Sequence, residues 1–269
     1  MVLTAIESRL RFQSVPFPQA RALPTAYGLT DERNWLRGTF SRQYDAAAAT
    51  VARVLAGHPR FQAAPETLVD ATAVHLYLSA FGVGLPAALR RGDPGPHVPF
   101  GRCVSAGLER LPSYRGAAGL RAVLGAEEVR EIGAHRVLRD WGFTEALIEP
   151  PADLPGTVDV LVWSMTARHT RLLEPDDDYR ADHRVVFLPG TSFKVLEATE
   201  PGPGRRGRLL LRELSPDERD RGHVAFDDLT VPSLHRAAAQ WGGAAGSAGL
   251  GAAAMPRFGA VPGTRMKSC

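Results

Sequence analysis

The sequence has few lysines and no concentrated basic stripe. Of its 32 basic residues only Lys194 and Lys267 are lysines, and the formal net charge is +3. The arginines are scattered along the chain, and many of them lie near acidic residues. Because nucleic-acid-binding proteins usually gather their basic residues on one face or along one helix, we expect no nucleic-acid partner.

Disulfide, signal and membrane-spanning patterns are also lacking. Two cysteines, Cys103 and Cys269, cannot form a framework of several disulfides. The N-terminal residues carry Arg9, Arg11 and Pro16 without a continuous apolar stretch, unlike a secretory signal. No apolar run reaches the ~18–20 residues of a transmembrane helix. We expect a protein without membrane contact in a reducing, cytoplasmic setting, although export without a leader would leave no trace here.

Motifs for metal and common catalytic centres are missing as well. The eight histidines form no pair at the helical or strand spacing of metal ligands. The sequence has no Gly-rich phosphate loop of the Walker or Rossmann type and no serine in a nucleophile elbow. We therefore expect no metal site.

Composition divides the chain into three segments. Residues 1–28 are rich in proline, and we expect them to be irregular. Residues 29–241 carry the apolar periodicity and are predicted to form one domain, since a chain with 44% hydrophobic residues can build a substantial core. Residues 242–269 are rich in Gly and Ala without an apolar period, which predicts a disordered tail.

The central segment reads as helices followed by strands. Helical spacing and capping predict helices over 30–55, 65–81, 85–91, 103–111, 127–141 and 232–241. Short apolar runs bounded by turn residues predict strands over 113–119, 158–166, 184–188, 193–198 and 209–214. Helices first and closely spaced strands later are typical of an α+β fold, with a helical N-terminal half and a mixed or antiparallel β core.

One predicted strand, Val158–Thr166, ends with two hydroxyls on one face. Side chains alternate along a strand, so Ser164 and Thr166 share a face with Val158, Val160 and Val162. Buried hydroxyls need hydrogen-bond partners. Two interpretations stay open: each hydroxyl bonds a neighbouring backbone group, or the two hydroxyls line a cleft at the end of the strand.

Arg115 stands between two apolar segments in Pro112-Ser-Tyr-Arg-Gly116. Arginine is rarely buried without a partner, and its planar guanidinium fits a carboxylate or a phosphate equally well. Gly116 beside it would let a ligand or another backbone approach closely. The alternative is an exposed loop arginine, and the residues alone do not decide between the two.

Three segments together resemble the ADP-ribosyltransferase family. The helix that runs into Tyr114-Arg-Gly116 is similar to the family's aromatic-Arg-Gly segment, and Trp163-Ser-Met-Thr166 is similar to its aromatic-Ser-Thr-Ser motif. The segment Arg184-Val-Val-Phe-Leu-Pro-Gly-Thr-Ser-Phe-Lys-Val195 resembles the strand, turn and strand that follow the family's Glu-x-Glu. The resemblance covers about residues 65–215.

The resemblance implies NAD as the ligand, bound in a cleft between sheets. It implies that Arg115 holds the phosphates or ribose of NAD, with Gly116 beside it. It further implies that Ser164 supports the nicotinamide ribose and places the catalytic carboxylate, and that Thr166 braces the same strand. The family's reaction transfers ADP-ribose to a protein or small-molecule acceptor, and a carboxylate stabilises the positive charge that develops on the ribose.

The third motif departs from the family. Counted back from the Pro-Gly-Thr turn, its two glutamates fall at Asp182 and Arg184, and a guanidinium has the wrong sign for the second. The carboxylate would then come from Asp182, from the acidic run 174–178 or from Glu213 on the last predicted strand. The sequence therefore predicts an NAD-dependent transferase, with a catalytically silent NAD- or protein-binding module on the same scaffold as the alternative.

Overall fold

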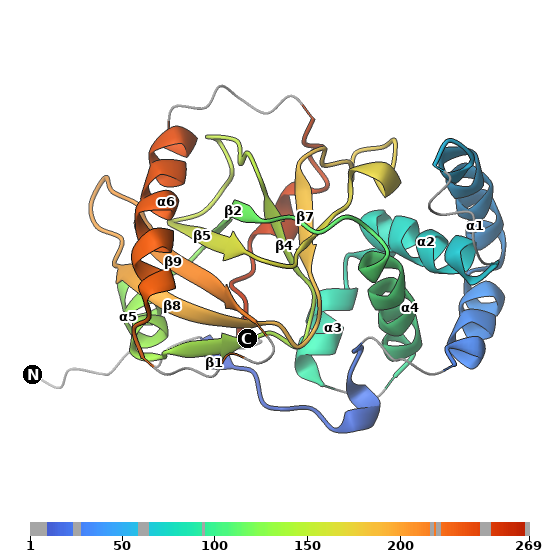
Figure 1. Ribbon diagram of the computed structural model, residues 1–269, viewed down its shortest axis with the longest axis horizontal. Coiled ribbons are helices and arrows are strands. Elements are labelled where there is room, and N and C mark those ends of the chain that lie inside the picture. The colour runs from blue at the N-terminus through green and yellow to red at the C-terminus, as the bar shows by residue number, and fades with distance from the viewer. Residues whose placement is uncertain are drawn as a thin grey trace, which may run out of the picture.

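The computed structural model places a helical half beside a twisted sheet (Figure 1). It describes residues 10–23, 28–58, 65–92, 95–215, 218, 222–242 and 249–266. The helical half comes first in the chain and the strands follow, so the predicted α+β class with a mixed β core is confirmed.

Four α-helices build the N-terminal half, and their bounds are α1 (Thr30–Ala56), α2 (Pro65–Leu78), α3 (Leu85–Arg91) and α4 (His97–Glu109). Helix α1 merges two helical pieces across a kink at Ser41, whose φ is 38°. Helices α2 and α4 pack closely because Gly107 has no side chain: a Cβ there would lie 2.3 Å from the carbonyl oxygen of Asp70. The helices thereby share one apolar core.

The helix predicted over 65–81 is three residues too long: α2 ends at Leu78, and Gly82 lies in the short turn that follows. A Cβ at Gly82 would meet the carbonyl oxygen of Tyr77 at 1.8 Å, so only glycine fits the turn η3 (Ala80–Gly82). Among the described residues no single helix is long and apolar enough to cross a membrane. The bent pair Pro65–Leu78 and Ala80–Arg91, with an 82° angle between its halves, passes that test of length and composition jointly.

The main sheet has eight strands in the order β3-β8-β9-β5-β2-β4-β7-β6. Their bounds are β2 (Gly116–Ala122), β3 (Val137–Arg139), β4 (Thr144–Leu147), β5 (Val158–Ser164), β6 (Arg168–His169), β7 (Arg184–Phe187), β8 (Ser192–Thr199) and β9 (Gly207–Leu214). Of the described pairs, only β5 and β9 run parallel. Buried Val160, Val162, Leu209 and Leu211 place the sheet's core on these two strands.

Two helices accompany the sheet, α5 (Ala126–Ala134) and α6 (Ala225–Gly242). The helix predicted over 127–141 is too long: it ends at Ala134, and β3 (Val137–Arg139) pairs with β8 instead. The periodicity predicted too long a helix because Leu138 and Trp141 continue its apolar spacing, although Leu138 lies in β3 and Trp141 in the loop that follows. Pairing with a strand far along the chain overrides local periodicity.

The two outer segments of the chain are more ordered than predicted. Leu10–Phe12 form β1, which pairs antiparallel with β10 (Thr264–Met266), so the expectation of an irregular 1–28 fails at this strand. The disorder predicted for 242–269 is wrong for Gly242, which is the last residue of α6, and for residues 249–266, which include the helical turn η5 (Met255–Phe258). The remainder of that prediction, over 243–248 and 267–269, lies outside the described residues.

The tail is held by a few anchors that average composition hides. Phe258 and Ala254 are completely buried and Val261 is 3% exposed, all within the core of the sheet. Arg257 donates to the carboxylate of Glu145 through Nε at 2.9 Å and Nη2 at 2.6 Å. Burying one large aromatic side chain offsets much ordering entropy, even in a segment otherwise made of Gly and Ala.

A buried carboxylate links the helical half to the sheet and makes stability depend on pH. Asp140 accepts hydrogen bonds from Arg90 Nε at 3.0 Å, Arg90 Nη2 at 2.8 Å, Gln13 at 2.9 Å and the amide of Gly142 at 2.9 Å. Burial alone would raise the pKa of Asp140, but the Arg90 guanidinium and these donors outweigh it and hold that pKa below its ordinary value.

Asp140→Asn is expected to lower the thermal midpoint at neutral pH, with a gap from wild type that narrows in acid. A lowered folded-state pKa contributes stability that is complete above the unfolded value of about 3.9 and is lost as pH falls through the folded value. Thermal midpoints of both proteins, measured from about pH 7 to about pH 2, test this. A gap that stays constant over this range would contradict the assignment of Asp140 as ionised and paired with Arg90.

Candidate active site

The arginine motif lies at the start of β2 and the serine motif at the end of β5, and these two strand ends are side by side. Gly116 and Ser164 are Cα partners in the antiparallel pair, so Arg115 directly precedes the point of contact. The amide of Tyr114 donates to the carbonyl of Ala167 at 2.7 Å, and the Ser164 hydroxyl donates to the carbonyl of Tyr114 at 3.0 Å. The structure therefore brings the two motifs together, with Arg115 exposed and Ser164 buried.

Glu213 is the carboxylate beside these motifs. It lies on β9, parallel to β5, and is 3% exposed. Its Oε2 accepts hydrogen bonds from the amides of Met165 at 2.6 Å and Thr166 at 2.9 Å, and the Ser164 hydroxyl lies 3.4 Å away. Its Oε1 accepts a hydrogen bond from the Thr166 hydroxyl. Glu213 thus fixes the turn that follows β5.

The hydroxyls of Ser164 and Thr166, which the strand pattern placed on one face, have different hydrogen-bond partners. Ser164 has one hydrogen to donate, and the carbonyl of Tyr114 at 3.0 Å is a better acceptor in distance than Glu213 at 3.4 Å. Its oxygen also accepts from the amide of Ala167 at 3.1 Å. Ser164 therefore bonds neighbouring backbone, as the first interpretation has it, whereas Thr166 bonds the Glu213 carboxylate, a partner that neither interpretation named.

The Tyr114 side chain packs so close to residue 116 that only glycine fits there. The Tyr114 hydroxyl donates to the carbonyl of Ala117 at 2.7 Å and thereby folds the ring over Gly116. A Cβ at Gly116, where φ is 146°, would lie 2.8 Å from that hydroxyl. The group that approaches Gly116 is thus the Tyr114 side chain, and burial raises the pKa of its phenol.

Arg184 belongs to a buried ionic cluster, in which its charge is paired with Glu145 and Glu174. It is completely buried, with Nη1 3.0 Å from Glu145 Oε2, Nε 3.3 Å from Glu174 Oε1 and Nη2 donating to the carbonyl of Tyr179 at 2.5 Å. The backbone of β7 runs near the site through β6, since His169 pairs with Val185. The Arg184 guanidinium is therefore paired with glutamates from other segments of the chain.

The other proposed carboxylates also have partners elsewhere. Asp182 Oδ1 accepts from Arg180 at 2.7 Å, and the Asp182 amide donates to the carbonyl of Gly249 at 3.0 Å. Glu174 accepts from the Thr170 hydroxyl and the Ala181 amide. Burial raises the pKa of Glu174, although the charge of Arg184 counteracts part of that shift. Of the three alternatives, Glu213 has recorded contacts with Ser164 and Thr166.

Sequence reasoning missed Arg168. Its backbone pairs with Ser113, immediately before the arginine motif, and its Nη1 donates to the carbonyl of Leu111 at 3.1 Å. Its Nε is buried and has no hydrogen-bond partner among the described residues. A free guanidinium donor next to Tyr114 and Arg115 is suited to an anion. The only sequence signal was its place two residues after the Ser-Met-Thr motif.

Comparisons with known proteins identify the fold. No family model matches the sequence, and no curated protein matches it. Among solved structures, the type III effector XopAI from Xanthomonas axonopodis pv. citri is 18% identical, with 73% of this chain and 86% of that chain covered and a TM-score of 0.56.

Two further structures are an ADP-ribosyltransferase and a protein complex that contains carba-NAD. The ADP-ribosyltransferase HopU1 of Pseudomonas syringae pv. Tomato DC3000 is 10% identical, with coverage of 70% of this chain and 99% of that one and a TM-score of 0.58. Exoenzyme S from Pseudomonas aeruginosa, solved with human 14-3-3 protein beta and carba-NAD, is 16% identical, with coverage of 75% and 96% and a TM-score of 0.53.

These similarities define the fold class of the chain. The chain has the fold of ADP-ribosyltransferases, as the three motifs implied. At these identities the comparison concerns the arrangement of helices and strands and assigns no role to any residue.

Proposed function

We propose that this chain binds NAD beside Arg115 and Ser164 and transfers ADP-ribose to a protein or small-molecule acceptor, with Glu213 as the carboxylate. The observation that carries the proposal is the contact of the Glu213 carboxylate with the Ser-Met-Thr turn next to the arginine motif. The shared fold with HopU1 and with the carba-NAD complex of exoenzyme S supports NAD as the ligand.

The cations of the site suit a diphosphate. Arg115 is exposed at the start of β2, and Arg168 offers a buried Nε without a partner among the described residues. Guanidinium groups bind phosphate oxygens through two parallel hydrogen bonds, which fixes position as well as charge. We assign Arg115 to the phosphates of NAD and Arg168 to an adjacent anionic oxygen of the same ligand.

The reaction requires negative charge at the ribose. When the bond between nicotinamide and ribose breaks, its electron pair leaves with nicotinamide, and positive charge develops on the ribose until the acceptor attacks C1 and loses a proton. A carboxylate about 4 Å from that charge contributes about 4 kcal/mol at an effective dielectric of about 20. Glu213 is preorganised for this role because three donors already hold it in place, the amides of Met165 and Thr166 and the Thr166 hydroxyl.

The same three donors favour the second candidate, a catalytically silent binding module. A carboxylate has about four lone-pair positions, and Glu213 is only 3% exposed. If the turn saturates Glu213, the carboxylate is structural, and the scaffold binds NAD or a protein without turnover. The two candidates therefore differ in whether Glu213 reaches the ribose.

Glu213→Gln is expected to reduce nicotinamide release from NAD by on the order of 10²–10³, the usual effect of losing one preorganised electrostatic contact. Asp182→Asn is the matched control, because it neutralises a partly exposed carboxylate that pairs with Arg180. Release is measured at saturating NAD, and thermal midpoints verify that each variant is folded. Equal rates for Glu213→Gln and wild type would remove Glu213 from the reaction.

Calorimetric titration of NAD into wild type and Arg115→Ala separates the two candidates. If Arg115→Ala binds NAD more weakly than wild type, and wild type releases no nicotinamide, the silent binding module is favoured over the transferase. Absence of NAD binding by wild type would reject NAD as the ligand and both NAD-dependent candidates with it.

A further inference from the structure

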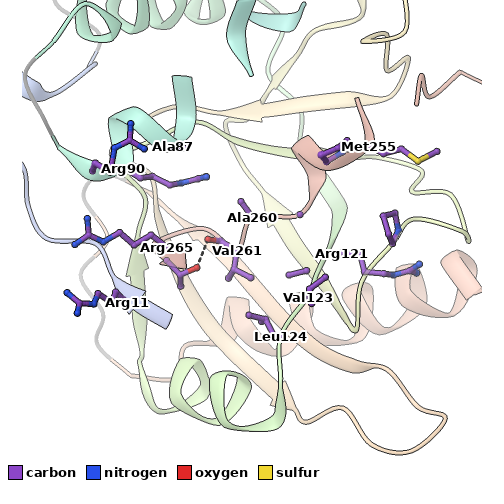
Figure 2. Close-up of a pocket in the computed structure, with 16 residues that line it drawn as sticks. Arg11, Ala87, Arg90, Arg121, Val123, Leu124, Met255, Ala260, Val261 and Arg265 are labelled. Carbon is purple, nitrogen blue, oxygen red and sulfur yellow. Dashed lines mark hydrogen bonds between the residues drawn. The ribbon is translucent and has the colours of Figure 1, made fainter. Parts of the chain in front are cut away.

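A cavity of about 980 Å³ lies away from the candidate active site. Its walls come from the end of α3, the loop after β2, the tail around η5 and the two-stranded ribbon of β1 and β10 (Figure 2). Neither Arg115, Ser164, Thr166 nor Glu213 lines it. Both outer segments of the chain therefore contribute to a site that the motifs of the central domain do not include.

The walls carry positive charge and no carboxylate. The charged residues that line the cavity are all arginines: Arg11, Arg90, Arg91, Arg121 and Arg265. Arg90 and Arg121 are paired with Asp140 and Asp159 behind the wall. No Asp or Glu is among the described residues of the lining.

Arg11 and Arg265 form the centre of this charge. They are direct partners in the antiparallel register of β1 and β10, and Figure 2 shows both side chains extending from the ribbon toward the same side. Among the described residues neither has a carboxylate within ion-pair distance. Like charges directly opposite each other on two strands repel, so an anion between them would be stabilising.

Most of the other lining residues are apolar. Val123 is 70% exposed although it is a large hydrophobic residue in a loop, and it lines the cavity beside Leu124 and Val261. Met255 adds a flexible thioether from η5. Such a surface accepts the apolar or planar body of a ligand whose charged end is held elsewhere.

We propose that this cavity binds a ligand with two or more phosphate groups attached to an apolar or planar body. Phosphate oxygens fit the planar donor fork of arginine, and two forks side by side fit two phosphates better than one carboxylate. The volume is at the upper end of the range of about 300–1,000 Å³ for small-molecule sites, which accommodates a ligand of nucleotide size. A nucleotide and a phosphorylated lipid headgroup share this chemistry.

The test compares three proteins by calorimetric titration with inorganic pyrophosphate and with ATP. Arg11→Ser/Arg265→Ser removes the two central charges. Arg205→Ser/Arg206→Ser is the matched control, because it removes two exposed arginines from the turn between β8 and β9. We expect affinity for both probes to fall at least about tenfold in the first variant and to change less than about twofold in the control.

Equal losses in the two variants would show unspecific attraction to basic surface and would overturn the proposal, as would the absence of binding to wild type. If Arg11→Ser/Arg265→Ser does not fold, hydrogen exchange of wild type replaces it: pyrophosphate must protect the amides of β1 and β10, and unchanged exchange rejects the site. Arg11→Lys/Arg265→Lys keeps the charge without the fork, and we expect an intermediate affinity.

Two further arms distinguish the sources of the phosphates. Vesicles of phosphatidylcholine, with and without a phosphatidylinositol bisphosphate, are sedimented with each protein. If the phosphorylated lipid retains wild type but not Arg11→Ser/Arg265→Ser, the cavity binds a lipid headgroup. If wild type binds ATP and is not retained by the vesicles, the cavity binds a free nucleotide. Arg115→Ala must keep its affinity for pyrophosphate, and a loss there would place the probe in the candidate active site instead.

Discussion

Replacing Glu145 with alanine is expected to lower the free energy of unfolding by about 3–5 kcal/mol, the usual effect of leaving buried charges unpaired. Glu145 lies on β4 and is the shared partner of Arg184 and Arg257, with contacts at 3.0 Å and 2.6 Å. The side chains of all three are at most 4% exposed. Burial alone would raise the pKa of Glu145, but Arg257 and Arg184 hold it below its ordinary value.

Urea denaturation measures this effect, and Glu200→Ala is its control. Glu200 pairs with Arg130 at 3.0 Å, but the two side chains are 42% and 66% exposed. We expect a change below about 1 kcal/mol there, because solvent screens such pairs. Similar destabilisation in both variants would show that burial of the Glu145 cluster adds nothing to the strength of its ion pairs.

Phe258→Ala is expected to destabilise the protein by about 3–5 kcal/mol, although it changes a segment that composition predicts to be disordered. The ring is completely buried in the core of the sheet and lies against the Arg184 guanidinium, 5.6 Å from its carbon to the ring centroid. Its removal leaves a cavity and uncovers the ionic cluster. Chemical denaturation of wild type and variant gives the difference.

Leu229→Ala provides the comparison for Phe258→Ala. Leu229 is a large apolar residue of α6 that is 71% exposed, so we expect a change within about 0.5 kcal/mol. A chain that ends before residue 249 should lose at least as much stability as Phe258→Ala. If truncation leaves the denaturation midpoint unchanged, the tail does not dock as the structure shows.

The long central strands could be predicted from the sequence, whereas the short ones could not. β5 (Val158–Ser164) and β9 (Gly207–Leu214) carry enough apolar residues in sequence to stand out. β4 (Thr144–Leu147) and β6 (Arg168–His169) are too short for a periodic signal and are strands because β7 pairs with both. β1 and β10 each have three residues, and each depends on the other for its hydrogen bonds.

The candidate site shows the same division between local and distant information. The resemblance to ADP-ribosyltransferases implied that Arg115 and Ser164 lie together, and the pairing of Gly116 with Ser164 puts the two motifs side by side. The place of Arg184 did not follow, since Glu145 lies on another strand and no local pattern links the two. Arg184→Glu, which the motif alone suggests as a restoration, would place a third carboxylate against Glu145 and Glu174 and should destabilise the fold.

The ribbon of β1 and β10 also has a consequence for the order of folding. It joins Leu10–Phe12 to Thr264–Met266, so its hydrogen bonds close a loop of nearly the whole chain. Loop-closure entropy opposes such a contact until intervening segments have condensed, and contacts of this sequence separation form slowly. The arginine-lined cavity therefore comes into existence only when the rest of the chain has folded, and a ligand bound there would select completed molecules from partly folded ones.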